Sequence, residues 1–106
     1  MTENRGLELC KHTPSWDLLR RSIRIEEGKG LDYARAKRLA DQEAAKASSE
    51  PMLLAWYDAK EGKFSPGVEC CCHTNKKPSW LIYAETRGGE IQVVINDLEY
   101  VFVYRP

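Results

Sequence analysis

A run of small apolar residues at helical spacing constrains the fold of this chain more than any other sequence feature. The pattern predicts a helix over Leu31 to Ser48, capped by Asp32 and stopped before Pro51, because proline disfavours helix in the residue that precedes it. One face of this helix carries Tyr33, Ala36, Ala40, Ala44 and Ala47. Such a helix would be about 27 Å long at 1.5 Å per residue, so it needs a sheet to cover.

The chain after this helix changes to strand-like patterns. Met52–Tyr57 is a continuous apolar run, as expected for a strand covered on both faces, and Asp58–Lys63 reads as a turn. Trp80–Thr86 is expected to form a strand, followed by a two-residue hairpin turn at Gly88-Gly89. A second hairpin is expected at Asn96-Asp97, or with a loop one residue longer.

The proposed hairpins divide the side chains between two faces of the sheet. The first face would carry Ile82, Ala84, Ile91, Val93, Ile95, Leu98, Tyr100, Phe102 and Tyr104. We expect this face to meet the alanine face of the helix, because large side chains opposite alanine fill space well. The second face would carry Tyr83, Val94, Val101 and Val103. We expect the first thirty residues or a second copy of the chain to cover these apolar residues.

The first thirty residues show less pattern and are interpreted as an irregular N-terminal arm. A short helix or turn is expected near Thr13–Asp17, followed by a short strand over Ile23–Glu26. The glycine-containing segment Glu27–Gly30 is expected to interrupt regular secondary structure. The predicted fold class is therefore α+β, with one long helix on a meandering antiparallel sheet of about four strands. The chain is expected to be a single domain, 1–106, with the arm at 1–30 and the helix-on-sheet core at 31–106.

Three stretches connect this chain to a known family. They are Leu31–Ala34, Pro51–Asp58 and the run from Trp80 through Gly88-Gly89 to Tyr104. Over residues of about 31–104 the chain resembles a family of small uncharacterised bacterial and archaeal proteins, described as a domain of unknown function. The resemblance implies a small α+β domain with a helix on an antiparallel sheet, and it implies no activity.

Charge and hydropathy argue against several classes of partner. The chain has 16 Lys+Arg and 16 Asp+Glu, so its zero net charge supplies no field to attract nucleic acid or a membrane surface. Local basic residues are interleaved with acids, which is typical of a solvated helix face; they are Arg20, Arg21, Arg24, Lys29, Arg35, Lys37 and Arg38. The sequence contains no apolar run of membrane-spanning length and starts without a signal-peptide core. We therefore expect a cytoplasmic protein with reduced thiols.

A cysteine run, Cys70-Cys71-Cys72-His73, is the candidate site for chemistry. Thiolates and imidazole suit zinc, but alternate residues of an extended segment point to opposite sides, so this run offers one ion about two ligands. Cys10 and His12 are the remaining candidates, and both segments place Cys and His shortly before Pro-Ser-Trp. The sequence lacks the C-x-x-C spacing typical of zinc sites.

The same thiols allow two other interpretations. Neighbouring cysteines can form a strained, readily reduced disulfide, which would make the run redox-active. Alternatively, some of the cysteines are small apolar side chains of the core. A nucleophilic enzyme would have to combine Cys72 with His12 or His73 and with Asp58 or Asp97, but adjacent strand residues diverge. Phosphate-loop and nucleophile-elbow motifs are absent from the sequence, which argues against an enzyme.

Two function classes follow. The first is a non-enzymatic interaction module, expected to be a homodimer, with no membrane or nucleic-acid partner and no indicated small-molecule ligand. The second is a thiol site, binding a metal such as zinc or acting in redox, built on Cys70, Cys72 and His73 with Cys10 and His12.

Overall fold

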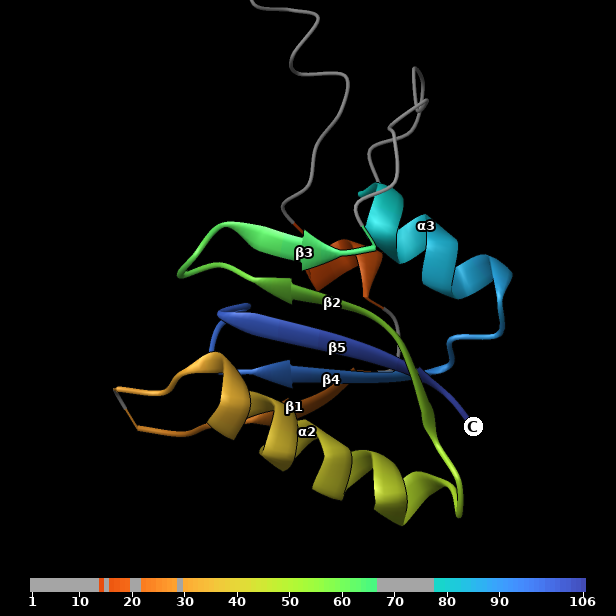
Figure 1. Cartoon of the computed structure of the whole chain (residues 1–106), viewed down its shortest axis with the longest axis horizontal. Helices are drawn as coiled ribbons and strands as arrows, with labels where there is room; N and C mark the ends of the chain where they lie inside the picture. Colours follow the sequence, from red (N-terminus) through yellow and green to blue (C-terminus); the bar gives the residue numbers. More distant parts are fainter. Residues whose placement is uncertain (1–13, 15, 20–21, 29, 67–77) are drawn as a thin grey trace, which may run out of the picture.

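Eight elements build the described part of the chain, which in this computed structural model comprises residues 14, 16–19, 22–28, 30–66 and 78–106. In chain order they are the 3-10 helix η1 (Trp16–Leu18), strand β1 (Ser22–Ile25), helix α2 (Tyr33–Ala47), strands β2 (Met52–Asp58) and β3 (Lys63–Ser65), helix α3 (Ser79–Thr86), and strands β4 (Ile91–Ile95) and β5 (Tyr100–Arg105). The strands form one sheet in the order β1-β4-β5-β2-β3 (Figure 1).

The sheet is mixed, because β1 runs parallel to β4 while the other described strand pairs are antiparallel. The α+β class is therefore confirmed, whereas the expected meander of about four antiparallel strands is wrong. The strand expected near Ile23–Glu26 is present as β1 and forms one edge of the sheet. The other edge, β3, begins at Lys63, the last residue of the turn that the sequence analysis expected. A three-residue strand carries too little alternation to be recognised locally.

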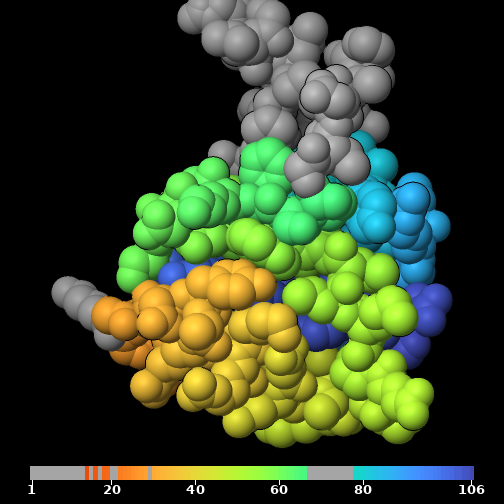
Figure 2. All heavy atoms as spheres, in the orientation of Figure 1, coloured from red at the N-terminus to blue at the C-terminus, as the bar shows by residue number. Residues whose placement is uncertain are grey.

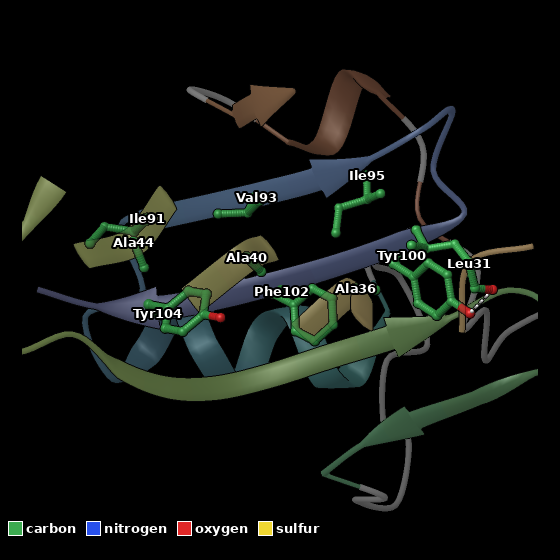
Figure 3. Close-up of a cluster of buried hydrophobic side chains, with 10 residues drawn as sticks. All are labelled: Leu31, Ala36, Ala40, Ala44, Ile91, Val93, Ile95, Tyr100, Phe102 and Tyr104. Atoms are coloured by element: carbon green, nitrogen blue, oxygen red, sulfur yellow. Dashed lines mark hydrogen bonds between the residues drawn. The ribbon is translucent and has the colours of Figure 1, made fainter. Parts of the chain in front are cut away.

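Helix α2 begins and ends close to the expected positions. Asp32 is the N-cap, and its side chain accepts a hydrogen bond from the Arg35 backbone N–H at 2.9 Å. Ala36, Ala40 and Ala44 are fully buried, whereas Ala47 at the helix end is exposed. Figure 3 shows these three alanines over β4 and β5, next to Val93, Phe102 and Tyr104. The expected packing of large side chains against the alanine face is therefore confirmed.

Strand β2 confirms the apolar run over Met52–Tyr57 as a strand that packs on both faces. Leu53 and Trp56 pack against the α2 side, while Leu54, Ala55 and Tyr57 pack against the other side. The pairing with β5 shifts register between Leu53 and Ala55. A bulge of this kind adds one residue to a strand, which explains how two consecutive residues, Leu54 and Ala55, serve the same side.

The segment Trp80–Thr86 is a helix, α3, and not the expected strand. Its buried residues include Trp80, Leu81 and Ala84, a spacing of one and then three that fits a helical turn and no strand. Eight residues of high apolarity satisfy both periods, so periodicity cannot separate a short buried helix from a strand. Pro78 at the N-cap is the local signal for a helix start that the sequence analysis did not use.

The Gly88-Gly89 pair ends α3 and does not form the expected hairpin turn. Gly88 has φ of +85°, and the Gly88 and Gly89 N–H groups donate to the carbonyls of Glu85 at 3.3 Å and Ala84 at 2.8 Å. This is the glycine-terminated helix end in which two backbone bonds satisfy the last carbonyls. The two glycines have different tasks, because a Cβ at Gly89 would lie only 2.7 Å from Val103 Cγ1.

The second face of the sheet is covered by α3 and by residues near η1. Its core comprises Leu19, Ala55, Tyr57, Trp80, Leu81, Ala84, Val94, Val101 and Val103. The N-terminal cover that the sequence predicted is thus present in part through Leu19 and Trp16, and α3 supplies the rest. Ala84 and Leu98 belong to this side and not to the α2 side, which corrects their expected placement.

The β4–β5 connection is a hairpin, as expected, with a longer loop. Ile95 pairs with Tyr100, so Asn96–Glu99 form the turn, in which Asn96 and Leu98 have positive φ. Leu98 is therefore in the loop. Tyr100, Phe102 and Tyr104 keep the predicted side, facing α2.

Replacing Gly89 with alanine tests the close approach of α3 to β5. Gly89→Ala should reduce the free energy of unfolding by about 1–3 kcal/mol, because the new methyl group collides with Val103 and the Ala84 carbonyl. Urea denaturation followed by circular dichroism measures this. Gly28→Ala is the matched control, since a Cβ there meets nothing within 4 Å and should change stability by no more than about 0.5 kcal/mol. Equal effects for both variants would contradict the packing described.

Enlarging the alanine face tests the contact between α2 and the sheet. Ala40→Leu should lower the free energy of unfolding by about 1–3 kcal/mol through overpacking, since Ala40 is 0% exposed. The same substitution at exposed Ala45, on the same helix, should stay within about 0.5 kcal/mol of the parent. Thermal and urea denaturation of both variants measure the difference. A neutral Ala40→Leu variant would show that α2 lies farther from the sheet.

Candidate functional site

The residues predicted as a metal or redox site lie outside the described part of the structure. These are Cys10, His12, Cys70, Cys72 and His73, and Cys71 lies there too. Every cysteine and histidine of the sequence is therefore outside the described ranges. Within those ranges, no group of three or more acidic, His or Cys residues is arranged to hold a metal ion. The zinc and redox hypotheses remain predictions.

The two aspartates considered as orienting groups of a nucleophilic site both hold the fold. Asp58 is only 3% exposed, and its Oδ1 accepts hydrogen bonds from the backbone N–H groups of Lys60 at 2.9 Å and Glu61 at 3.1 Å. This contact closes the turn between β2 and β3. Asp97 accepts a hydrogen bond from Trp16 Nε1 at 2.9 Å, which ties η1 to the β4–β5 turn.

A polar cluster lies where the chain enters α2. The Leu31 carbonyl accepts a hydrogen bond from Lys60 Nζ at 2.6 Å. It also accepts one from the Tyr100 hydroxyl at 3.2 Å, which Figure 3 shows. Lys60 also lies 3.8 Å from Glu99. Burial, with a smaller contribution from Asp58, raises the pKa of Tyr100 to about 12. The hydroxyl therefore stays protonated as a donor, and the cluster fixes the loop before α2.

Asn96 connects this region to β1. Its backbone N–H donates to the Ile25 carbonyl at 2.7 Å, and its Oδ1 accepts from the Glu27 backbone N–H at 2.8 Å. Its Nδ2 donates to Glu99 Oε1 at 2.6 Å. The φ of 58° at Asn96 is a conformation that asparagine tolerates well. These bonds attach the end of β1 and the segment after it to the β4–β5 turn.

A small polar hollow opens beside these contacts, with a volume of about 160 Å³. Glu27, Gly28, Gly30, Leu31 and Arg35 line it. The two charged residues pair with each other, since Arg35 Nη2 lies 3.1 Å from Glu27 Oε2. This hollow therefore presents a neutralised ion pair, which has little to offer a charged ligand.

A second surface follows the line where α2 faces β2, and we call it the α2–β2 seam: Tyr33, Lys37, Asp41, Leu53 and Trp56, with Tyr104 beneath. Figure 2 shows blue atoms of the C-terminal strands between the yellow α2 and the yellow-green β2. The Tyr33 and Trp56 rings lie 4.7 Å apart, centre to centre. Both side chains are half-buried, a state typical of aromatic residues at binding surfaces.

The charges of the α2–β2 seam are already satisfied. The Tyr104 hydroxyl donates to Asp41 Oδ1 at 2.5 Å, and Lys37 Nζ lies 2.8 Å from Asp41 Oδ2. Burial first, and the hydrogen bond to Asp41 second, raise the pKa of Tyr104 above its ordinary value. A protonated hydroxyl and a carboxylate bound to an ammonium group form a polar contact that can recognise a partner. The sequence signal for this surface is the four-residue spacing of Tyr33, Lys37 and Asp41, which the sequence analysis did not use.

Three of the basic residues noted in the sequence have contacts within the chain. Arg24 lies over the Trp16 ring, 4.0 Å from its centre, while Arg35 pairs with Glu27 and Lys37 with Asp41.

None of the described helices combines the length and apolarity needed to cross a membrane.

The sheet ends in two edge strands, each with a single neighbour among the described strands. β3 has three residues and leads into Pro66, which has no N–H to donate. β1 has four residues beside β4. An edge strand presents backbone groups that can pair with another chain, and shortness or proline reduces this tendency. β1 is therefore the more open edge.

Known proteins are similar to this chain in sequence and in fold. The family model described as Domain of unknown function (DUF5619) matches residues 20–104, which include both edge strands and both helices. A protein of Archaeoglobus fulgidus described as uncharacterized is 32% identical over 80 residues, covering 76% of this chain and 82% of the relative. The crystal structure of the A. fulgidus protein AF1514 superimposes with a TM-score of 0.64 at 28% identity, covering 79% of this chain and 91% of the other. The chain therefore belongs to the DUF5619 family.

Proposed function

We propose that this chain is a cytoplasmic, non-enzymatic interaction module that works as a homodimer. One observation carries the proposal, namely the open outer edge of β1, which has no strand beside it within the described chain. Backbone N–H and C=O groups at such an edge favour pairing with another strand. A second copy of the same chain is the partner that supplies a matching edge at equal concentration, and two-fold homodimers are the commonest soluble oligomers.

The polar contacts of the described residues support a binding role over a catalytic one. Asp58, Asn96 and Tyr100 hold turns and the entry to α2. Asp41 and Tyr104 join α2 to β5. Catalytic groups typically combine a perturbed pKa with access to a substrate, whereas Tyr100 and Tyr104, whose pKa values are raised, are nearly fully buried, at 1% and 2% exposure. Burial is also the main cause of the raised pKa of Tyr33, which is half-buried against Trp56.

The oligomeric state tests this proposal directly. Sedimentation equilibrium from 1 to 200 µM should give a mass of two chains, each of 12.1 kDa, with dissociation at the lowest concentrations. Native mass spectrometry of the same preparation provides an independent mass. A single-chain mass at every concentration up to 200 µM would overturn the homodimer.

A thiol site is the second candidate, and one observation favours it. The described residues that flank the two cysteine segments, Trp16, Phe64 and Trp80, pack in one hydrophobic cluster. Cys10 is four residues from Pro14, and Cys70 is four residues from Pro66. A chain spans at most about 3.5 Å per residue, so the distance of each cysteine from its described flank is bounded. A zinc ion bound by Cys10, His12, Cys70, Cys72 and His73, in a set of four, or a redox pair among them, is compatible with these starting points.

Metal analysis tests this second candidate. Protein purified under argon without chelator or histidine tag should contain about one zinc ion per chain if four of these ligands meet. Cys72→Ser and Cys10→Ser should each lose most of the zinc, whereas Met52→Ser, which changes an exposed side chain remote from the cysteines in sequence, should retain it. A metal-free parent protein with four thiols that stay reduced in air would refute both the zinc and the redox versions.

A further inference from the structure

The backbone of β1 alternates between the neighbour β4 and the open edge. The Ile25 carbonyl accepts a hydrogen bond from the Asn96 N–H at 2.7 Å, and the Glu27 N–H donates to Asn96 Oδ1 at 2.8 Å. The odd-numbered residues therefore direct their backbone groups toward β4. Because N–H and C=O groups alternate sides along a strand, Ser22, Arg24 and Glu26 direct theirs to the outer edge.

The side chains of β1 alternate in the same way between the two faces of the sheet. Ile23 and Ile25 pack partly buried against the core under α2. Arg24 lies on the opposite face, over the Trp16 ring, and is exposed. Glu26 follows Arg24 by two residues, so it continues the same face, and it is exposed as well. The outer edge thus carries one cation and one anion on one face and two isoleucines on the other.

A two-fold axis allows a few antiparallel registers of β1 with β1 of a second copy, because outward-facing residues must oppose one another. An axis at Arg24 places the two Arg24 side chains directly opposite, which is repulsive. An axis at Ile23 places Arg24 opposite Ser22, which leaves the charge without a partner. An axis at Ile25 places Arg24 opposite Glu26 of the second copy, twice by symmetry.

We propose that two copies of this chain join β1 to β1 in antiparallel orientation, with Ile25 at the two-fold axis. The inference rests on the proposed homodimer and names its surface and register. Arg24 and Glu26 of each copy then form two charge pairs and exchange backbone hydrogen bonds with Glu26 and Arg24 of the second copy. The two Ile25 side chains meet on the α2 face, which joins the two cores. The five strands of each copy become one continuous ten-stranded sheet.

Other surfaces of the described chain fit a second copy less well. β3 offers three residues and then Pro66, so its edge can form few backbone bonds. Strand β2, which contributes Leu53 and Trp56 to the α2–β2 seam, begins with Met52, a large apolar residue that is 51% exposed. Lys37 and Asp41 of the seam already pair within the chain. The start of β2 at Met52 is therefore the competing surface that the experiment must separate from β1.

Charge reversal tests the register. Arg24→Glu and Glu26→Arg should each raise the dimer dissociation constant about tenfold or more at low salt, because each replaces two attractive pairs with two repulsive ones. The double variant Arg24→Glu/Glu26→Arg restores opposite charges and should bring the constant back to within about threefold of the parent. Sedimentation equilibrium at 50 and 500 mM salt measures these constants, and the differences should shrink at high salt.

The variants need a fold control, because Arg24 also contacts Trp16. Glu26→Arg leaves that contact in place, so its effect alone already tests the pairing. Thermal denaturation by circular dichroism of each variant shows whether the monomer is folded. Met52→Gln, at the exposed start of β2, is the matched control and should leave the dissociation constant unchanged.

Amide hydrogen exchange provides a second measurement on the unmodified chain, because it distinguishes the even-numbered residues of β1 from the odd-numbered ones. The Arg24 and Glu26 N–H groups should become protected as concentration rises through the dissociation constant. The Ile25 N–H, which faces β4, should be protected at all concentrations.

The outcomes separate the inference from the proposed function. A single-chain mass at all concentrations overturns both. A dimer that Met52→Gln dissociates while both charge reversals leave it intact keeps the homodimer and overturns the β1 interface. Weakening by both reversals without recovery in the double variant overturns the register with Ile25 at the axis.

Discussion

The close contact between the alanine face of α2 and the aromatic side chains of β5 is the constraint on which the rest of this structure depends. Ala36, Ala40 and Ala44 are fully buried, and Phe102 and Tyr104 fill the space beside them. The small alanine side chains allow the α2 backbone to approach the sheet closely. The large side chains of the sheet then fill the interior, so the helix contributes only alanines at these positions. The Tyr104–Asp41 hydrogen bond then fixes the helix along this contact.

The two helices cover opposite faces of the sheet and different parts of it. α2 packs on β4 and β5, whereas α3 packs on β2 and β5. β5 is therefore covered on both faces, and its five residues from Tyr100 to Tyr104 are all buried. The outer strands β1 and β3 receive less cover. This arrangement places a stable centre between two edges, and it explains why an interaction surface is better sought at an edge than on a sheet face.

Sequence patterns predicted the parts of the fold whose signals are long and local. The helix over Leu31–Ser48 has a cap, a stop and a periodic face, and the alternation in β5 assigned Tyr100, Phe102 and Tyr104 to the side of α2. The α3 segment was misread because a short apolar run fits two periods, and Gly88-Gly89 is typical of both a hairpin turn and a helix end. The predicted thiol residues lie outside the described ranges, so the structure leaves that hypothesis as it was.

Composition and local periodicity were sufficient to establish the α+β class, the position of α2 and the face of β5 that α2 covers, because each depends on residues close together in the sequence. Strand order, the parallel pairing of β1 with β4 and the use of α3 to cover the second face depend on contacts between distant segments. The bonds from Asn96 to Ile25 and Glu27, which leave the even-numbered residues of β1 at the open edge, join positions about seventy residues apart. Such contacts have no local signature, since the packing of the whole chain selects them.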